Sequence, residues 1–222
     1  PSHHLAVGQV GAGVHIDGIS RVRSEFLDYQ VREGAGALGR LDARADTLYR
    51  LESVLLEPPV GIADGLNGVW GAFEDLANSP SDGGVREAVI GALDNLVDRI
   101  RMASSGIDTV EDHTRVQLRS AIDETNGLLT QLADLNEQIT FAGTGGEVPN
   151  DLLDRRDILL DRLAELASVR VTDSGDGTIR VSSHGIALVE GTVAIELTLE
   201  ADGVTVTTPG GFDAAPGGTI GG

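Results

Sequence analysis

Carboxylates are the side chains most able to do chemistry in this chain, and three of them share the spacing of one helix face. Asp154, Asp157 and Asp161 are three and four residues apart, so a helix would present them together as oxygen ligands for a divalent cation. Three arginines alternate with them, at positions 155, 156 and 162. Because cations at this spacing favour surface ion pairs, we interpret the carboxylates as structural and predict no metal there.

A second acidic segment, residues 173–177 (DSGDG), is similar to a calcium-binding loop. It lacks the third ligand position and the closing Glu that such a loop requires, so we interpret it as a turn between strands. His3 and His4 could bind a metal, but a histidine pair this close to the first residue is more typical of an added sequence or a solvent-exposed segment.

The remaining motifs of catalysis and cofactor binding are missing from the sequence. His15, His113 and His184 stand far apart, without an HExxH or nucleophile-elbow pattern around them. There is no Walker A motif, and Gly11-Ala12-Gly13 lacks the third glycine of a dinucleotide site. The absence of cysteine excludes thiol nucleophiles and disulfides. The sequence therefore predicts no catalytic residue, no cofactor and no metal.

The net charge of the chain disfavours two large classes of partner. Sixteen Arg and Lys against 35 Asp and Glu give a formal charge of −19. Phosphate-rich partners require clustered positive charge, so we expect neither nucleic acid nor an anionic membrane surface to bind. No apolar run reaches the ~18 residues of a membrane helix, and no signal peptide is visible.

The stretch that must position everything else is residues 116–167. Apolar positions Leu118, Ile122, Thr125, Leu129, Leu132 and Ile139 recur every three or four residues, with Asn136 as a polar interruption. This spacing predicts a long amphipathic helix. Residues 143–146 (GTGG) break it, and a second helix is expected from about Asn150, which we assign as its N-cap. The unit is a helix hairpin with one long and one short arm.

Further helices are expected before this hairpin. One should run from about Ile19 to Leu56, with its glycines marking a kink or a close approach of another backbone, and should end before Pro58. A second should cover residues 63–78, with Trp70 in its buried face. Ser81 or Asp82 should cap a third, from Val85 to about Val110, which either continues into the organising helix or bends at Gly106.

After Ala167 the apolar period changes to two, which indicates short antiparallel strands and a hairpin around residues 193–206. We therefore predict an α+β fold: mainly α, an elongated helical bundle followed by a smaller antiparallel β part. The expected segments are a flexible start (1–13), a helical bundle beginning with a short strand (14–167), a β element (168–208), and a Gly/Pro-rich linker without core contacts (209–222).

Several segments of this chain match one known protein family. They are residues 132–139 (LADLNEQI) with 150–157 (NDLLDRRD) across a glycine-rich loop, residues 76–82 (LANSPSD), and residues 185–191 (GIALVEG). Together they resemble the family of the first hook-associated protein of bacterial flagella, which joins hook to filament. The family-motif positions, expected to be structural, are Leu76, Asn78, Pro80, Asp82, Leu135, Asn136, Ile139, Asn150, Asp151, Leu152, Leu153, Asp154, Arg156 and Asp157.

The resemblance implies a non-enzymatic axial component of the flagellum, exported without a cleaved signal peptide. The implied partners are the hook protein, the second junction protein, and an export chaperone for the full-length protein. The chain resembles a fragment without terminal polymerisation segments, so we expect it to be largely monomeric. The alternatives are a flagellin-like filament protein, an acidic metal-binding domain, and a coiled-coil adaptor that would dimerise through residues 116–141.

Overall fold

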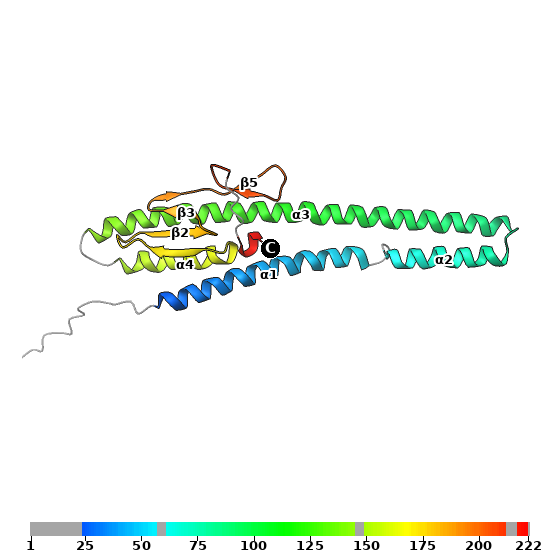
Figure 1. The fold of residues 1–222 in the computed structure, drawn as a ribbon, viewed down its shortest axis with the longest axis horizontal. Helices are drawn as coiled ribbons and strands as arrows, with labels where there is room; N and C mark the ends of the chain where they lie inside the picture. Colours follow the sequence, from blue (N-terminus) through cyan, green and yellow to red (C-terminus); the bar gives the residue numbers. More distant parts are fainter. Residues whose placement is uncertain (1–23, 57–60, 145–148, 212–216, 222) are drawn as a thin grey trace, which may run out of the picture.

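One helix runs the whole length of the molecule, and the other elements lie along it (Figure 1). The computed structural model describes residues 24–56, 61–144, 149–211 and 217–221. Helix α3 (Gly83–Gly143) has 61 residues, which corresponds to about 90 Å at ~1.5 Å per residue. It joins the two helices expected at residues 85–110 and from 116 onward. Gly106 lies inside this continuous helix, where the side chain of Val54 packs against it.

Three more helices pack along α3. Helices α1 (Glu25–Leu56) and α2 (Ile62–Asn78) lie end to end beside it, and α4 (Asn150–Leu166) returns antiparallel at its C-terminal end (Figure 1). The hairpin of a long and a short helix is thereby confirmed. The strand expected at residues 14–19 lies outside the described residues, and α1 begins at Glu25 rather than at Ile19.

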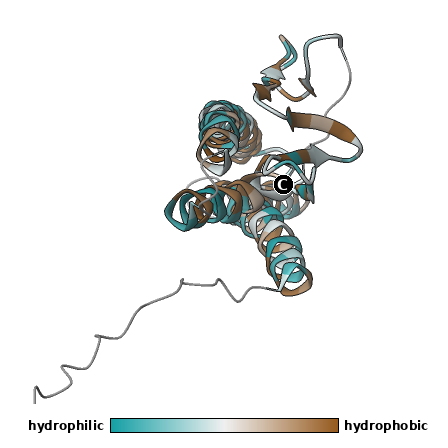
Figure 2. Cartoon of the chain, turned by 90° about the vertical axis from the view of Figure 1, so that its left-hand side faces the viewer, coloured by the Kyte–Doolittle hydropathy of each residue, from teal (hydrophilic) through white to brown (hydrophobic). Residues whose placement is uncertain are grey.

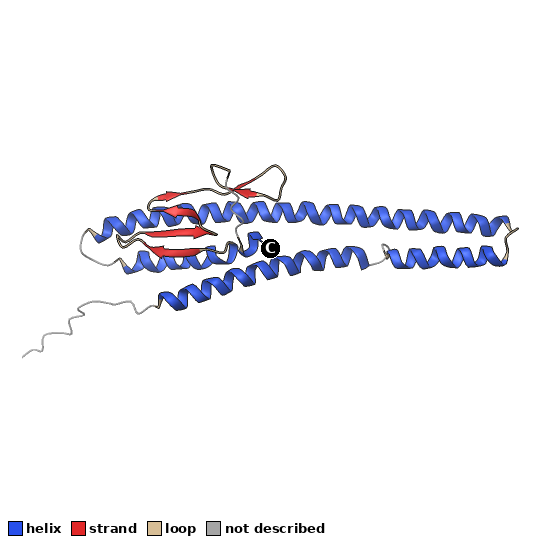
Figure 3. Ribbon diagram, in the orientation of Figure 1, coloured by secondary structure: helices blue, strands red, loops and turns tan. Residues whose placement is uncertain are grey.

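Strands gather at the end of the molecule where α4 lies (Figure 3). Four of them form an antiparallel sheet in chain order: β1 (Arg170–Asp173), β2 (Ile179–Ser183), β3 (Ile186–Glu190) and β4 (Val193–Ala194). A separate pair follows, β5 (Thr198–Leu199) and β6 (Val206–Thr207). The hairpin around residues 193–206 is therefore shorter than expected, because its first two residues pair with β3 instead.

Local sequence explains where several elements begin. Asp82 is the N-cap of α3, since its Oδ1 accepts a hydrogen bond of 2.8 Å from the Gly84 N–H. The prediction that Asn150 caps α4 is wrong. The cap position belongs to Pro149, whose side chain makes no cap hydrogen bond, and Asn150 is the first helical residue.

The core lies where α3, α4 and the sheet meet. From α3 it takes Leu129 and Leu132, both fully buried, and from α4 Leu160 and Leu163. Val181, Leu188 and Val189 of the sheet close this core from the other side. The apolar positions that recur between residues 118 and 139 thus face the core, as predicted, and Asn136 is buried among them.

The end of the chain contributes to the core, contrary to the expectation of a linker without core contacts. Residues 218–221 form a short 3-10 helix, η1, that packs on α1 and α4, and Ile220 joins the buried cluster. Gly218 has φ +66° and lies against the backbone of Leu166 and Ala167. A side chain at this position would clash with that backbone, so glycine permits the contact.

One predicted buried face is wrong, and a neighbouring helix also leaves large apolar side chains exposed. Trp70 was expected in the core of its helix, but its side chain is 66% exposed, and α2 packs on α3 through Gly65 and Val69. In α1, Leu38 and Leu41 are more than half exposed, while Arg32 and Gly36 are buried. The end-on view shows hydrophobic positions on the outer surfaces of the helices as well as between them (Figure 2).

Candidate interaction site

The motif residue Asn136 is a fully buried polar side chain in the core. Its Nδ2 donates to the carbonyl oxygens of Ile179, at 2.9 Å, and Gly191, at 2.7 Å. Its Oδ1 accepts from the Ile179 N–H at 3.2 Å. Asn136 therefore satisfies backbone groups at the start of β2 and after β3. It connects the long helix to the sheet.

A second asparagine makes the same kind of contact ten residues earlier on α3. Asn126 Nδ2 donates to the Leu197 carbonyl oxygen at 2.9 Å, and its Oδ1 accepts from the Leu197 N–H at 2.8 Å. Asn126 was not among the residues predicted to be functional from the sequence. Its position among apolar residues of the 116–167 stretch was the available signal, since a polar residue on a core face requires a partner.

The motif residues of α4 bind two other elements. Arg156 donates to the carbonyl oxygen of Gly177, at 2.9 Å, in the turn before β2. Asp157 and Asp161 accept from Arg32 of α1, at 3.3 and 2.9 Å. The partner of these two carboxylates is therefore an arginine that is only 8% exposed. For Asp157 and Asp161, this ion pairing agrees with the interpretation that the carboxylates are structural.

Glycines allow α1 to cross very close to α4. A Cβ on Gly39 would lie 2.4 Å from the Glu165 carbonyl oxygen, and one on Gly36 would lie 3.0 Å from that of Ala164. The expectation that glycines in this helix mark a close approach of another backbone is confirmed for Gly36 and Gly39, whereas nothing lies within 4 Å of a Cβ placed on Gly34. With the Arg32 ion pairs one turn away, this crossing fixes α1 against the C-terminal half of α4.

The motif residues 76–82 form the turn between α2 and α3. Leu76 is half-buried, Asn78 ends α2, and Asp82 caps α3. The Pro80 carbonyl oxygen accepts from both Nε and an Nη of Arg86, at 3.1 and 2.8 Å. These residues join two antiparallel helices at the far end of the molecule from the sheet (Figure 1).

The motif positions thus fall into two separate groups. At the sheet end, Leu135 and Ile139 are buried, Leu152 and Leu153 are half-buried, and Asn150, Asp151 and Asp154 occupy the first turns of α4. The other group is the α2–α3 turn. The structure does not bring the two groups together, so they form no common binding site.

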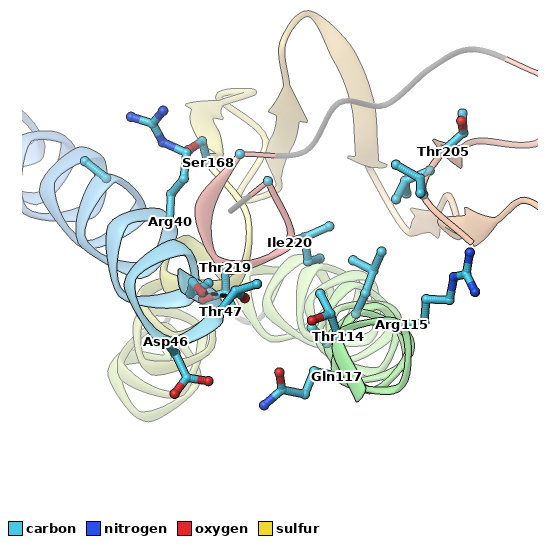
Figure 4. A pocket seen from close by; sticks show the side chains of 18 of the residues that line it. Arg40, Asp46, Thr47, Thr114, Arg115, Gln117, Ser168, Thr205, Thr219 and Ile220 are labelled. Carbon is cyan, nitrogen blue, oxygen red and sulfur yellow. Dashed lines mark hydrogen bonds between the residues drawn. The ribbon is translucent and has the colours of Figure 1, made fainter. Parts of the chain in front are cut away.

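A groove of about 1510 Å³ runs between α1, α3, η1 and the β5–β6 pair (Figure 4). Apolar side chains line part of it, including Ile107 and Leu118 of α3 and Ile220 of η1. Its threonine hydroxyls bond to nearby carbonyl oxygens: Thr47 to Ala43, and Thr219 to Glu165, each at 3.0 Å. The groove is open to solvent, and the hydroxyls of Thr47 and Thr219 are already bonded within the fold.

One serine–histidine pair at this groove has the residue types of an acyl-transfer site. Ser183 Oγ lies 3.2 Å from His184 Nδ1, but it donates its proton to the Ser168 carbonyl oxygen at 2.9 Å. A hydroxyl that donates elsewhere is not activated by the imidazole. Within the described ranges no group of three or more His, Asp or Glu residues could hold a metal ion.

Hydrogen bonding shifts the pKa of several surface groups. The hydroxyl of Thr205, followed by the N–H groups of Val204 and Thr205, lowers the pKa of Asp202 to about 2. Hydrogen bonds from the side chain and N–H of Thr178 lower the pKa of Asp176. Both carboxylates stabilise turns between strands. For Asp176 this agrees with the interpretation of residues 173–177 as a turn.

The fold and contacts define an elongated helical structural module, whose polar motif residues connect its own elements. In the described part of the chain no helix is long and apolar enough to cross a membrane. Residues 48–219 match the family model of the flagellar hook-associated protein FlgK helical domain. The chain therefore belongs to this family of structural flagellar proteins.

Curated relatives and a solved structure agree with this assignment. Flagellar hook-associated protein 1 of Bacillus subtilis is 31% identical over 86% of this chain, and that of Escherichia coli is 28% identical over 86%. The structure of the flagellar hook junction protein FlgK from Burkholderia pseudomallei has the same fold, with a TM-score of 0.76, 24% identity and 87% of this chain covered. The chain spans 37% and 36% of the two curated relatives and 38% of the solved chain.

Proposed function

We propose that this chain is a structural part of the junction between the flagellar hook and filament, outside the cell. The observation that carries the proposal is the match of residues 48–219 to the helical domain of the hook-associated protein. A helix of 61 residues, braced by α1, α2 and α4, suits a rigid element of an axial assembly. The proposed role requires no catalytic residue.

The proposed partners of the whole protein are the hook protein on one side and the second junction protein on the other. An export chaperone and the flagellar export apparatus would bring the full-length protein out of the cell without a cleaved signal peptide. The motif contacts support this role indirectly. Asn136, Arg156 and Asp157 hold the module in one shape, and a fixed shape is what repeated subunit contacts require.

The test is a binding assay with the full-length protein, purified hook protein and purified second junction protein. Residues 1–222 alone serve as the matched control, since they contain this module without the remaining length of its relatives. We expect the full-length protein to bind both partners and the 222-residue chain to bind weakly or not at all. If the full-length protein binds neither, the junction role is wrong and the metal-binding and adaptor alternatives return.

A further inference from the structure

An asparagine is followed by a glycine at two places in the sequence, Asn67–Gly68 in α2 and Asn126–Gly127 in α3. This dipeptide is prone to lose ammonia from the asparagine side chain, because glycine has no Cβ to keep its main-chain nitrogen away from that side chain. Both glycines have open surroundings, with nothing within 4 Å of an added Cβ. Steric access therefore does not distinguish the two sites.

An intact helix protects both asparagines from this reaction. The helical backbone holds the next main-chain nitrogen away from the asparagine Cγ, and the N–H of that nitrogen donates to a carbonyl oxygen one turn earlier. The ring that releases ammonia can close only when the turn around the asparagine opens. The rate at each site should therefore follow the free energy of local opening, which differs between parts of one protein.

Asn126 lies where α3 is held most firmly. Its Nδ2 donates to the Leu197 carbonyl oxygen at 2.9 Å, and its Oδ1 accepts from the Leu197 N–H at 2.8 Å. The residue before it, Thr125, and Leu129 one turn later are both fully buried. Opening α3 at this point would break both hydrogen bonds and expose part of the core. The fold therefore protects Asn126.

Asn67 is exposed on a helix with few stabilising contacts. Helix α2 has 17 residues, of which Gly65 and Val69 are buried. A helix this short depends on tertiary packing for its stability. Its N-cap residue, Gly61, makes no side-chain cap hydrogen bond. The helix also contains residues that each disfavour the helical conformation, namely Gly65, Gly68 and Gly71. The turn around Asn67 should therefore open far more often than the turn around Asn126.

We propose that Asn67 is a site of spontaneous deamidation in the folded chain, whereas Asn126 is protected. The main-chain nitrogen of Gly68 attacks Cγ of Asn67, the Cγ–Nδ2 bond breaks, and ammonia leaves with the proton of the Gly68 N–H. One water then opens the succinimide ring and returns a proton to that nitrogen. Hydrolysis at Cγ gives aspartate, and hydrolysis at the main-chain carbonyl carbon gives isoaspartate. Water is the co-reactant, and nothing is oxidised or reduced.

The two products would change α2 in different ways. Both place a negative charge at position 67, and isoaspartate also adds one carbon to the main chain, which interrupts the helical hydrogen-bond pattern. Helix α2 lies along α3, away from the sheet (Figure 1). The core formed by α3, α4 and the sheet contains no residue of α2. Deamidation at Asn67 should therefore loosen α2 on α3 and leave the sheet end of the molecule unchanged.

The experiment incubates the folded 222-residue chain at mildly alkaline pH and physiological temperature, and follows both asparagines by peptide mass spectrometry. Deamidation is detected as the mass difference between an amide and a carboxyl group, and chromatography separates aspartate from isoaspartate. The same chain unfolded in urea is the control for intrinsic reactivity. The variant Gly71→Ala strengthens α2 without altering the Asn67–Gly68 dipeptide, and its added Cβ has nothing within 4 Å. Far-UV circular dichroism verifies that this variant folds.

We expect Asn67 to deamidate about tenfold or more faster than Asn126 in the folded chain, and the two rates to converge in urea. Gly71→Ala should slow the reaction at Asn67 about fourfold to fivefold, which is the effect of this replacement on a helix equilibrium, and should leave Asn126 unchanged. The proposal is overturned if the two asparagines react at the same rate in the folded chain. It is equally overturned if Asn67 reacts only in urea, or if Gly71→Ala leaves its rate unchanged.

Discussion

Replacing Asn136 by alanine tests whether this side chain holds the sheet on the long helix. The substitution removes three hydrogen bonds, two to carbonyl oxygens of Ile179 and Gly191 and one from the Ile179 N–H. Asn136 is fully buried and Ile179 is 4% exposed, so the backbone groups left behind lose their partners away from water. At about 1–3 kcal/mol for each unsatisfied buried group, with Gly191 at the lower end, the expected loss is roughly 3–5 kcal/mol of unfolding free energy.

The assay is equilibrium unfolding in urea, followed by far-UV circular dichroism, with Asn67→Ala on the exposed surface of α2 as the control. The control should change the unfolding free energy by less than about 0.5 kcal/mol. Amide exchange gives a second, local readout, because the Ile179 N–H bonds to Asn136 and should lose protection. A loss below about 1 kcal/mol, with unchanged exchange at Ile179, would refute the assignment of Asn136 as the link between helix and sheet.

Two further predictions concern the helix crossing and a turn. Gly39→Ala should destabilise the chain by about 1–3 kcal/mol, since its Cβ would lie 2.4 Å from the Glu165 carbonyl oxygen. Gly34→Ala in the same helix is the control, because no atom lies within 4 Å of the added Cβ, and it should stabilise the chain by about 0.5–1 kcal/mol. Thermal melts compare the two variants. A change of stability in the same direction for both would contradict the close crossing of α1 and α4. The Asp202 carboxyl, whose folded pKa of about 2 lies below its ordinary value of 3.8, should stabilise the folded chain above pH 3.8 and lose this effect as the pH falls towards 2. NMR titration of Asp202 should show this low pKa, and Thr205→Val should raise it, because the threonine hydroxyl is the largest cause of the shift.

Much of this protein was determined by local patterns in the sequence. The apolar period of residues 118–139 predicts the helix that carries the core, and the change to a period of two after Ala167 predicts the strands. Asp82 begins α3 as an N-cap residue should. These predictions succeed because helix and strand periods, and caps, depend on residues within a few positions of each other.

Only the tertiary structure decided which apolar row each helix buries. Residues 69 and 70 of α2 are both apolar and stand about 100° apart on the helix. Either could face α3, and packing buries Val69 and leaves Trp70 exposed. The tertiary structure also decided the partners of Asn136 and Arg32, which lie at least 43 and 125 residues away in the sequence. It likewise decided the burial of Ile220, which depends on α1 and α4 being in place. A periodic pattern specifies a face relative to its own helix axis, but the element that covers that face is set by contacts between residues far apart in the chain.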